Sequence, residues 1–128
     1  MMKLIVIGNG MTGYKFCEKL VSRFPLKFEI TVFGEEPHCA YDRVHLSDFF
    51  KGKSGSDLCM AAPGWYSENG ICLHLGDPAA QIQRDKKRVI SLKGVEKEYD
   101  ILVMATGSAA LVPPIHGIEK KGVFVYRT

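Results

Sequence analysis

The fold is decided by residues 4–13, L-I-V-I-G-N-G-M-T-G. The first part, 4–7, is an unbroken apolar run rich in β-branched side chains, which is typical of a strand buried on both faces of a parallel sheet. A glycine turn follows, and we expect a helix over about 11–24, ended by a proline. Its apolar stripe toward the sheet has the spacing i, i+3, i+4 and i+7: Cys17, Leu20, Val21 and Phe24. A second buried strand at 28–33 completes a right-handed βαβ unit.

The rest of the chain has a weaker pattern of short elements. We expect a helical piece at 45–50 and one or two short helices within 56–69, with Ser56 as N-cap and Gly70 as stop. We also expect a strand at 71–75, a hairpin over 80–92, a short strand at 97–99 and a buried strand at 101–104. The 128 residues are the length of one ordinary domain. The sequence therefore predicts a single α/β domain with a central parallel sheet, helices and a small antiparallel β-meander.

Composition excludes several classes of protein. Lysine and arginine number 17 against 14 acidic residues, so the formal net charge is only +3. The densest basic cluster, 84–88, contains Asp85 and does not make the basic stripe of a nucleic-acid-binding face. No apolar run approaches the ~18 residues of a membrane span, and the run at 4–7 is too short for a signal peptide. We expect a soluble, cytoplasmic protein that binds neither nucleic acid nor membrane.

The cysteines and histidines form no recognisable ligand motif. The four cysteines lie 22, 20 and 13 residues apart, without the close spacing of zinc, thioredoxin-type or iron–sulfur motifs: Cys17, Cys39, Cys59 and Cys72. We expect buried free thiols; in a secreted chain, the alternative would be two disulfides. The histidines are scattered, so no metal site is expected.

The glycine turn carries the first chemical prediction. Gly8, Gly10 and Gly13 form a G-x-G-x-x-G motif directly between a buried strand and a helix. The first glycine permits the tight turn, the second lets a pyrophosphate approach the backbone, and the third lets the helix pack closely. The free amides of the first helical turn and the positive end of the helix dipole then meet the phosphate charge. The alternative is a glycine turn without a ligand.

An acidic residue is expected roughly 20 residues beyond this motif, where it binds the ribose of the nucleotide. Glu35 lies 22 residues after Gly13, with Glu36 beside it. A carboxylate here accepts hydrogen bonds from the ribose hydroxyls and repels a 2′-phosphate, which disfavours NADP at this site. The alternative is a solvated acidic turn, and it is the stronger alternative for Glu36.

Two further stretches are candidates for the same site. Arg43 follows the second strand closely enough for its guanidinium to fold over a pyrophosphate, although a surface arginine is the simpler interpretation. The sequence A-T-G-S at 105–108 ends a buried strand at the carboxyl edge of the sheet, where ligands bind in open α/β folds. A purely structural turn is the alternative there.

Together these stretches resemble the FAD-dependent pyridine-nucleotide reductases, which include the ferredoxin and rubredoxin reductases. The matching sequences are V-I-G-N-G-M-T-G at 6–13, I-T-V-F-G-E-E-P at 30–37, Y-D-R-V-H-L-S at 41–47 and A-T-G-S at 105–108. Within this group, V-F-G-E-E-P, A-Y-D-R-V-H-L-S and the closing V-F-V-Y-R-T at 123–128 are most similar to the N-terminal part of NAD(P)H-dependent nitrite reductase large subunits. The resemblance extends over the whole chain.

The resemblance implies a Rossmann-like FAD/NAD(P)-binding fold and assigns the glycine motif to FAD. It implies these cofactor-binding residues: Gly8, Gly10, Met11, Thr12 and Gly13 at the pyrophosphate, Glu35 at the adenosine ribose, Arg43 from the loop, backbone near Ala79 or Ala80 at the adenine edge, and Ala105, Thr106 and Gly107 closing the pocket. In such a reductase, NAD(P)H gives hydride to flavin. Electrons then reach siroheme and iron–sulfur centres that reduce nitrite to ammonia in nitrate assimilation.

The sequence also departs from the family. Asp48 stands where ferredoxin-reductase relatives often carry a lysine near the flavin, and only Cys39 lies where disulfide reductases carry a cysteine pair, which excludes a dithiol mechanism. The chain is also shorter than the family's proteins, so we expect residues 1–128 to be an FAD-binding half-domain of a longer reductase, inactive alone. Its expected partners are the remaining domains, a small subunit or a second copy. The alternatives are a non-catalytic nucleotide-binding module and a rubredoxin or ferredoxin reductase.

Overall fold

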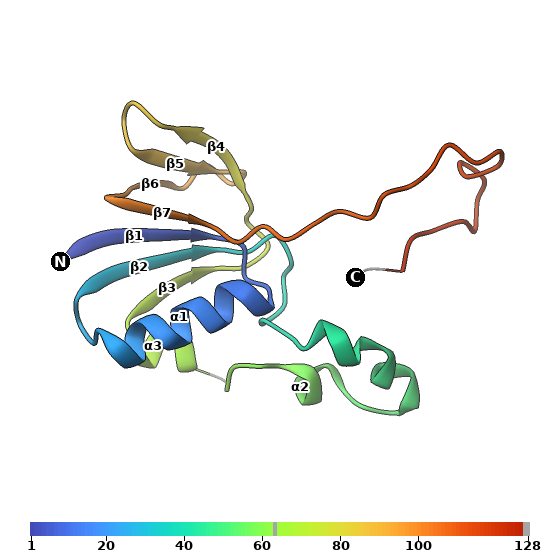
Figure 1. The fold of residues 1–128 in the computed structure, drawn as a ribbon, viewed down its shortest axis with the longest axis horizontal. Coiled ribbons are helices and arrows are strands. Elements are labelled where there is room, and N and C mark those ends of the chain that lie inside the picture. Colours follow the sequence, from blue (N-terminus) through green and yellow to red (C-terminus); the bar gives the residue numbers. More distant parts are fainter. Residues whose placement is uncertain (63, 127–128) are drawn as a thin grey trace.

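A four-stranded parallel sheet forms the centre of the computed structural model, which describes residues 1–62 and 64–126 (Figure 1). The strand order is β3-β2-β1-β7, with bounds Ile71–His74, Phe28–Phe33, Met2–Ile7 and Ile101–Met104. The register pairs Ile7 with both Phe33 and Met104, and Phe33 with His74. Because these are the last residues of their strands, all four carboxyl ends lie at one edge of the sheet.

The two faces of the sheet are covered by different layers (Figure 1). Leu4 and Val6 of β1 belong to the core shared with helices α1 (Met11–Arg23) and α3 (Trp65–Glu68). Ile5 and Ile7 belong to the core beneath a three-stranded antiparallel sheet of β4 (Ala79–Gln83), β5 (Arg88–Ser91) and β6 (Glu96–Glu98). Successive side chains of β1 alternate between these two cores, which explains why its sequence is apolar without interruption. This arrangement confirms the predicted α/β architecture with a small β-meander.

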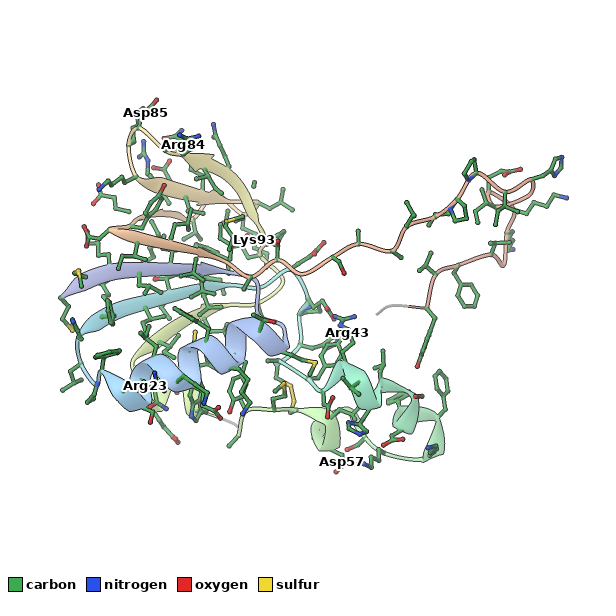
Figure 2. All side chains as sticks on the ribbon, in the orientation of Figure 1. Arg23, Arg43, Asp57, Arg84, Asp85 and Lys93 are labelled. Carbon is green, nitrogen blue, oxygen red and sulfur yellow. A yellow bond between two sulfur atoms is a disulfide. The ribbon has the colours of Figure 1, made fainter. Side chains whose placement is uncertain are left out.

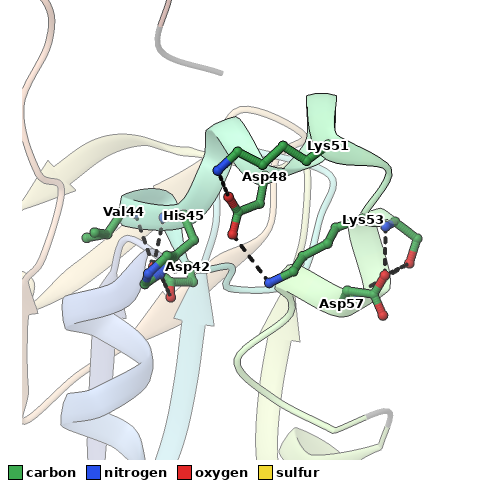
Figure 3. Close-up of polar contacts among 8 residues, drawn as sticks. Asp42, Val44, His45, Asp48, Lys51, Lys53 and Asp57 are labelled. Carbon is green, nitrogen blue, oxygen red and sulfur yellow. Dashed lines mark hydrogen bonds and ion pairs between the residues drawn. The ribbon is translucent and has the colours of Figure 1, made fainter.

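Short helices connect β2 to β3. They are η1 (Arg43–Lys51), a 3₁₀ helix with a kink, and α2 (Gly55–Leu58), followed by α3. The predicted cap at Ser56 is wrong, since the N-cap of α2 is Ser54. The Ser54 backbone N–H donates to the Asp57 carboxylate at 2.7 Å, and the Asp57 N–H donates back to the Ser54 hydroxyl at 3.3 Å (Figure 3). This reciprocal pair satisfies two backbone donors that a helix beginning later would leave open.

Two predicted burial patterns need correction. Phe24, the last position of the predicted apolar stripe, is 47% exposed and lies beyond the end of α1 at Arg23. The rest of the stripe is confirmed, since Cys17 is buried and Leu20 and Val21 pack against the same core. The strand β7 is not fully buried, since Ile101 is 38% and Met104 57% exposed. Within the described residues, β7 pairs only with β1 and forms an edge of the sheet.

The prediction of buried free thiols holds for Cys17 alone, whose burial raises its thiol pKa to about 12. Cys72 is free but exposed. Cys39 and Cys59 form a disulfide, with their Cα atoms 6.0 Å apart. The chain brings these two cysteines together because Tyr41 and Cys59 form an antiparallel β-bridge, a contact that linear spacing does not reveal.

Residues 105–126 leave the body of the protein as an extended arm that turns back toward η1 (Figure 1). The Tyr126 ring lies 6.1 Å from that of Phe50. The last two residues of the V-F-V-Y-R-T stretch, 127 and 128, lie outside the described residues. Among the described residues, no helix combines the length and apolar character needed to cross a bilayer.

A pair of glycine substitutions tests the packing of the glycine turn. A Cβ on Gly13 would overlap the carbonyl oxygen of Gly8, whereas a Cβ on Gly10 would meet no atom of the described residues within 4 Å. Gly13→Ala should therefore lower the free energy of unfolding by roughly 2 kcal/mol, and Gly10→Ala should lower it by less than about 1 kcal/mol. Urea unfolding followed by circular dichroism measures both. Equal losses for the two variants would contradict this packing.

Candidate nucleotide-binding site

The glycine loop begins directly at the end of β1. Gly8 has φ +111°, a conformation that favours glycine, and its N–H donates to the Phe33 carbonyl at 2.8 Å. A Cβ on Gly8 would overlap the carbonyl of Ala105, the residue after β7. The loop is therefore enclosed by backbone on two sides, while the space beside Gly10 is open in the described structure.

The start of α1 faces this open space. Gly10 is the N-cap of this helix of 13 residues, and in the described chain neither a side chain caps its amides nor an acidic residue occupies its first turn. The helix therefore begins with unsatisfied N–H donors and the positive end of its dipole, at Met11, Thr12 and Gly13. This arrangement can accept an anionic group that approaches the backbone at Gly10.

Asn9 fixes the loop to α3. The Tyr66 hydroxyl donates to Asn9 Oδ1 at 2.7 Å. Burial raises the pKa of Tyr66 to about 12, against the lowering effect of this hydrogen bond, so the phenol stays a neutral donor. Asn9 Nδ2 is buried without a hydrogen-bond partner among the described residues. The glycine loop thus keeps one amide donor unsatisfied, as expected of a loop that meets a polar ligand.

Glu35 lies just beyond the carboxyl end of β2 and is exposed. The preceding Gly34 donates its N–H to the His74 carbonyl at 2.8 Å, and a Cβ on Gly34 would lie 3.1 Å from the Cβ of Asn9. The loop that carries Glu35 therefore packs against the glycine loop. The structure brings the expected ribose-binding carboxylate and the expected pyrophosphate loop to one edge.

Arg43 takes part in a network that the sequence did not predict. Its Nη2 donates to Glu36 Oε1 at 2.8 Å, and the Tyr41 hydroxyl donates to Glu36 Oε2 at 2.8 Å. The guanidinium also lies over the Tyr41 ring, 5.1 Å from its centroid. Glu36 is half-buried, so it is not a freely solvated acid but the residue that orients Arg43. Figure 2 shows Arg43 beside the loop after β2. Two adjacent glutamates give no sequence signal of which one is paired.

The turn between β3 and β4 is attached to the same loop. Gly76 N–H donates to the Glu36 carbonyl at 3.1 Å, and Asp77 N–H donates to the Gly34 carbonyl at 3.0 Å. This attachment places Ala79, half-buried, and Ala80, exposed, at the start of β4 near the carboxyl edge of the sheet. Sequence reasoning did not single out Asp77, although its Gly-Asp-Pro context is a turn signal.

Asp77 is a buried carboxylate with backbone and side-chain donors. The Lys93 N–H donates to its Oδ1 at 2.9 Å. Burial raises the pKa of Asp77, but the hydrogen bonds from the Lys93 backbone and the Ser91 side chain outweigh it, and the pKa lies below its ordinary value. Asp77 thus ties the antiparallel sheet to the loops of the candidate site.

The A-T-G-S stretch closes the glycine loop from the other side. Ala105 N–H donates to the Ile7 carbonyl at 2.8 Å, continuing the pairing of β7 with β1. Thr106 and Gly107 are exposed, and Gly107 has φ +70°. Backbone atoms of Ala105 and Thr106 lie beside Gly8, and the expected role of residues 105–107 in closing a cofactor pocket stays a prediction.

Asp48, the departure from the family noted in the sequence, lies between two lysine side chains. Asp48 pairs with Lys51 at 3.2 Å and with Lys53 at 3.3 Å (Figure 3). The side-chain hydrogen bonds from both lysines lower the pKa of Asp48. Two lysine side chains therefore lie near this position, and both are paired with Asp48.

The family follows from a comparison with known sequences. The sequence model described as pyridine nucleotide-disulphide oxidoreductase matches residues 2–128. The chain belongs to this family. Over 127 residues it is 44% identical to the nitrite reductase (NADH) large subunit of Escherichia coli (strain K12), which covers 98% of this chain and 15% of that protein. It is 38% identical to the assimilatory nitrate reductase electron transfer subunit of Bacillus subtilis (strain 168), covering 98% of this chain and 16% of the relative.

Solved structures of reductases have the same fold. The NADH:rubredoxin oxidoreductase from Clostridium acetobutylicum is 26% identical with a TM-score of 0.80, covering 93% of this chain and 31% of that one. The ferredoxin reductase for the CYP199A2 system from Rhodopseudomonas palustris is 22% identical with a TM-score of 0.90, covering 100% and 32%. The predicted Rossmann-like fold is confirmed, as is membership of an oxidoreductase family. The chain spans about 15% of the length of the two curated relatives.

The role of Asp77 can be tested by its pH dependence. Its pKa is lower in the folded protein than its ordinary value of 3.8, so its stabilising contribution is present above pH 3.8 and is lost as the pH falls through the folded-state pKa. Asp77→Asn should therefore lower the unfolding free energy at pH 7, and the difference from the parent should shrink in acid. Urea titrations at pH 7, 5 and 3 measure this difference. A constant difference across these pH values would contradict the assignment.

Proposed function

We propose that this chain is the FAD-binding part of an NAD(P)H-dependent nitrite reductase large subunit and holds the ADP half of FAD. The observation that carries the proposal is the open space at Gly10, which the uncapped first turn of α1 faces. A Cβ would fill this space, and a pyrophosphate fits it in charge and hydrogen bonding. Similarity to a nitrite reductase large subunit supports the enzyme class.

In this proposal, each loop at the carboxyl edge of the parallel sheet has a role in binding FAD. Gly8 and Gly13 set the shape of the loop, and the amides of Met11 and Thr12 donate to phosphate oxygens at Gly10. Glu35 accepts hydrogen bonds from the ribose hydroxyls. The backbone at Ala79 and Ala80 borders the adenine, and Ala105, Thr106 and Gly107 close the pocket beside the loop.

Arg43 supplies positive charge from the loop after β2. Its Nη2 donates to Glu36 Oε1, and this hydrogen bond helps to fix the orientation of the planar guanidinium. In this proposal the guanidinium contacts the cofactor phosphates while Glu36 keeps it in place. The guanidinium also lies over the Tyr41 ring, which helps to hold it in this orientation.

The chemistry belongs to the bound cofactors of the longer protein. Bound FAD would supply the hydride-accepting and electron-transfer chemistry, and siroheme and iron–sulfur centres elsewhere in the protein would supply the reduction of nitrite. The residues described here bind and orient the adenosine end. Other domains, a small subunit or a second copy would complete the enzyme.

A rubredoxin or ferredoxin reductase is the second candidate, favoured by the structural similarity to the NADH:rubredoxin oxidoreductase. The candidates differ in the electron acceptor. A longer protein containing this chain should reduce nitrite with NAD(P)H if the first is right. Transfer to rubredoxin or ferredoxin without nitrite reduction would favour the second.

Titration calorimetry with ADP and FAD tests the binding site. Gly10→Ala should weaken binding of both at least tenfold, because its Cβ occupies the place of the pyrophosphate. Glu35→Ala should weaken binding by roughly 1–3 kcal/mol, the cost of a lost charge-assisted hydrogen bond. Glu29→Ala, at the other end of the same strand, is the matched control and should leave affinity unchanged. Parent-like affinity in both site variants would refute the site.

The role of Arg43 is tested by charge and salt. Arg43→Ala should lose more ADP affinity than Arg43→Lys, which keeps the charge but not the planar geometry. The loss should decrease as salt rises, because a partly exposed charge pair is screened. Calorimetry at two ionic strengths measures this dependence. If Arg43→Ala binds ADP like the parent at low salt, the arginine does not contact the phosphates.

A further inference from the structure

The disulfide lies within the loop that carries the candidate site. Cys39 follows Glu35 and Glu36 by only a few residues, and its partner Cys59 lies 20 residues further along the chain. Cys59 forms the antiparallel bridge with Tyr41, whose hydroxyl donates to Glu36 at 2.8 Å. The disulfide is therefore directly connected to the network that orients Arg43.

The segment that the disulfide encloses is buried mainly at its two ends. Residues 40–58 bury Ala40 and Leu58 at the two ends of the segment, while η1 between them has no buried residue in the described structure. Two backbone hydrogen bonds cross its base: Asp42 N–H to the Leu58 carbonyl at 2.8 Å, and Met60 N–H to the Ala40 carbonyl at 2.7 Å. A segment with so little buried surface opens at low cost unless a covalent link restrains it.

The four cysteines differ in their chemical accessibility. Cys39 and Cys59 are half-exposed, so an external thiolate can reach the disulfide. Cys17 is buried and its thiol pKa is raised to about 12 by that burial, which makes it unreactive. Cys72 is exposed, and its Sγ lies 3.4 Å from His74 Nε2. It is the thiol that has to be removed before the disulfide can be studied alone.

We propose that the Cys39–Cys59 disulfide is a redox modification site that sets the nucleotide affinity of the neighbouring edge. A dithiol reductant breaks the S–S bond: the protein takes up two electrons and two protons to form two thiols, and the reductant becomes a disulfide. Reduction frees residues 40–58 to open, which removes Tyr41 and Arg43 from their positions around Glu36. This inference rests on the proposed function, since it concerns the affinity of the same site.

The experiment uses the full chain with Cys72→Ser, as oxidised protein and after reduction with dithiothreitol. Iodoacetamide labelling followed by mass spectrometry should add two labels, at Cys39 and Cys59, only after reduction. Calorimetry with ADP should show roughly three- to tenfold weaker binding in the reduced state, because the competent loop conformation is then only partly populated. Cys39→Ser in the same background should bind like the reduced protein and should not respond to dithiothreitol.

The outcomes separate this inference from the proposed function. Equal ADP affinity in both redox states overturns the inference and leaves the proposed function intact. Labelling of both cysteines without reductant also overturns it. Absence of ADP binding in either state overturns the proposed function, and with it the link to affinity. Hydrogen exchange tests the opening itself: faster exchange over 40–58 after reduction supports it, and unchanged exchange contradicts it.

Discussion

The structure depends on a close approach of backbone segments at the glycine loop. The Gly8 carbonyl occupies the position that a Cβ on Gly13 would need, and the Ala105 carbonyl occupies the position that a Cβ on Gly8 would need. The end of β1, the first turn of α1 and the end of β7 therefore converge without side chains between them. This contact points the first turn of α1 at an open space and places the A-T-G-S stretch beside it.

Polar contacts between loops then arrange the rest of the edge. The carbonyls of Gly34 and Glu36 accept hydrogen bonds from the β3–β4 turn, so the loop after β2 is fixed from the side of the antiparallel sheet. Glu36 is occupied by Arg43 and Tyr41, which leaves Glu35 as the exposed carboxylate beside the glycine loop. Two neighbouring glutamates thus have separate tasks, one orienting a cation and the other available to a ligand.

The comparison with solved structures indicates that this fold depends on close backbone contacts more than on particular side chains. A reductase only 22% identical to this chain has a TM-score of 0.90, so the fold persists with few shared residues. Its requirements are a pattern of buried strands and a few glycines where backbones meet, which many sequences satisfy. The disulfide of this chain is a different kind of feature, because it restrains a segment that packing alone holds weakly.

The sequence by itself determined the parallel sheet, α1, the hairpin and the glycine loop, because these depend on local apolar periodicity and on glycines at a fixed spacing. It also predicted the edge at which Glu35 and Ala105 lie, since the carboxyl ends of parallel strands meet. Only the tertiary structure decided that Cys39 pairs with Cys59, that Glu36 binds Arg43, that Tyr66 holds Asn9 and that Asp77 joins the two sheets. Each of these contacts depends on how loops fold back in space, and neither residue of a pair carries a sequence signal that specifies its partner.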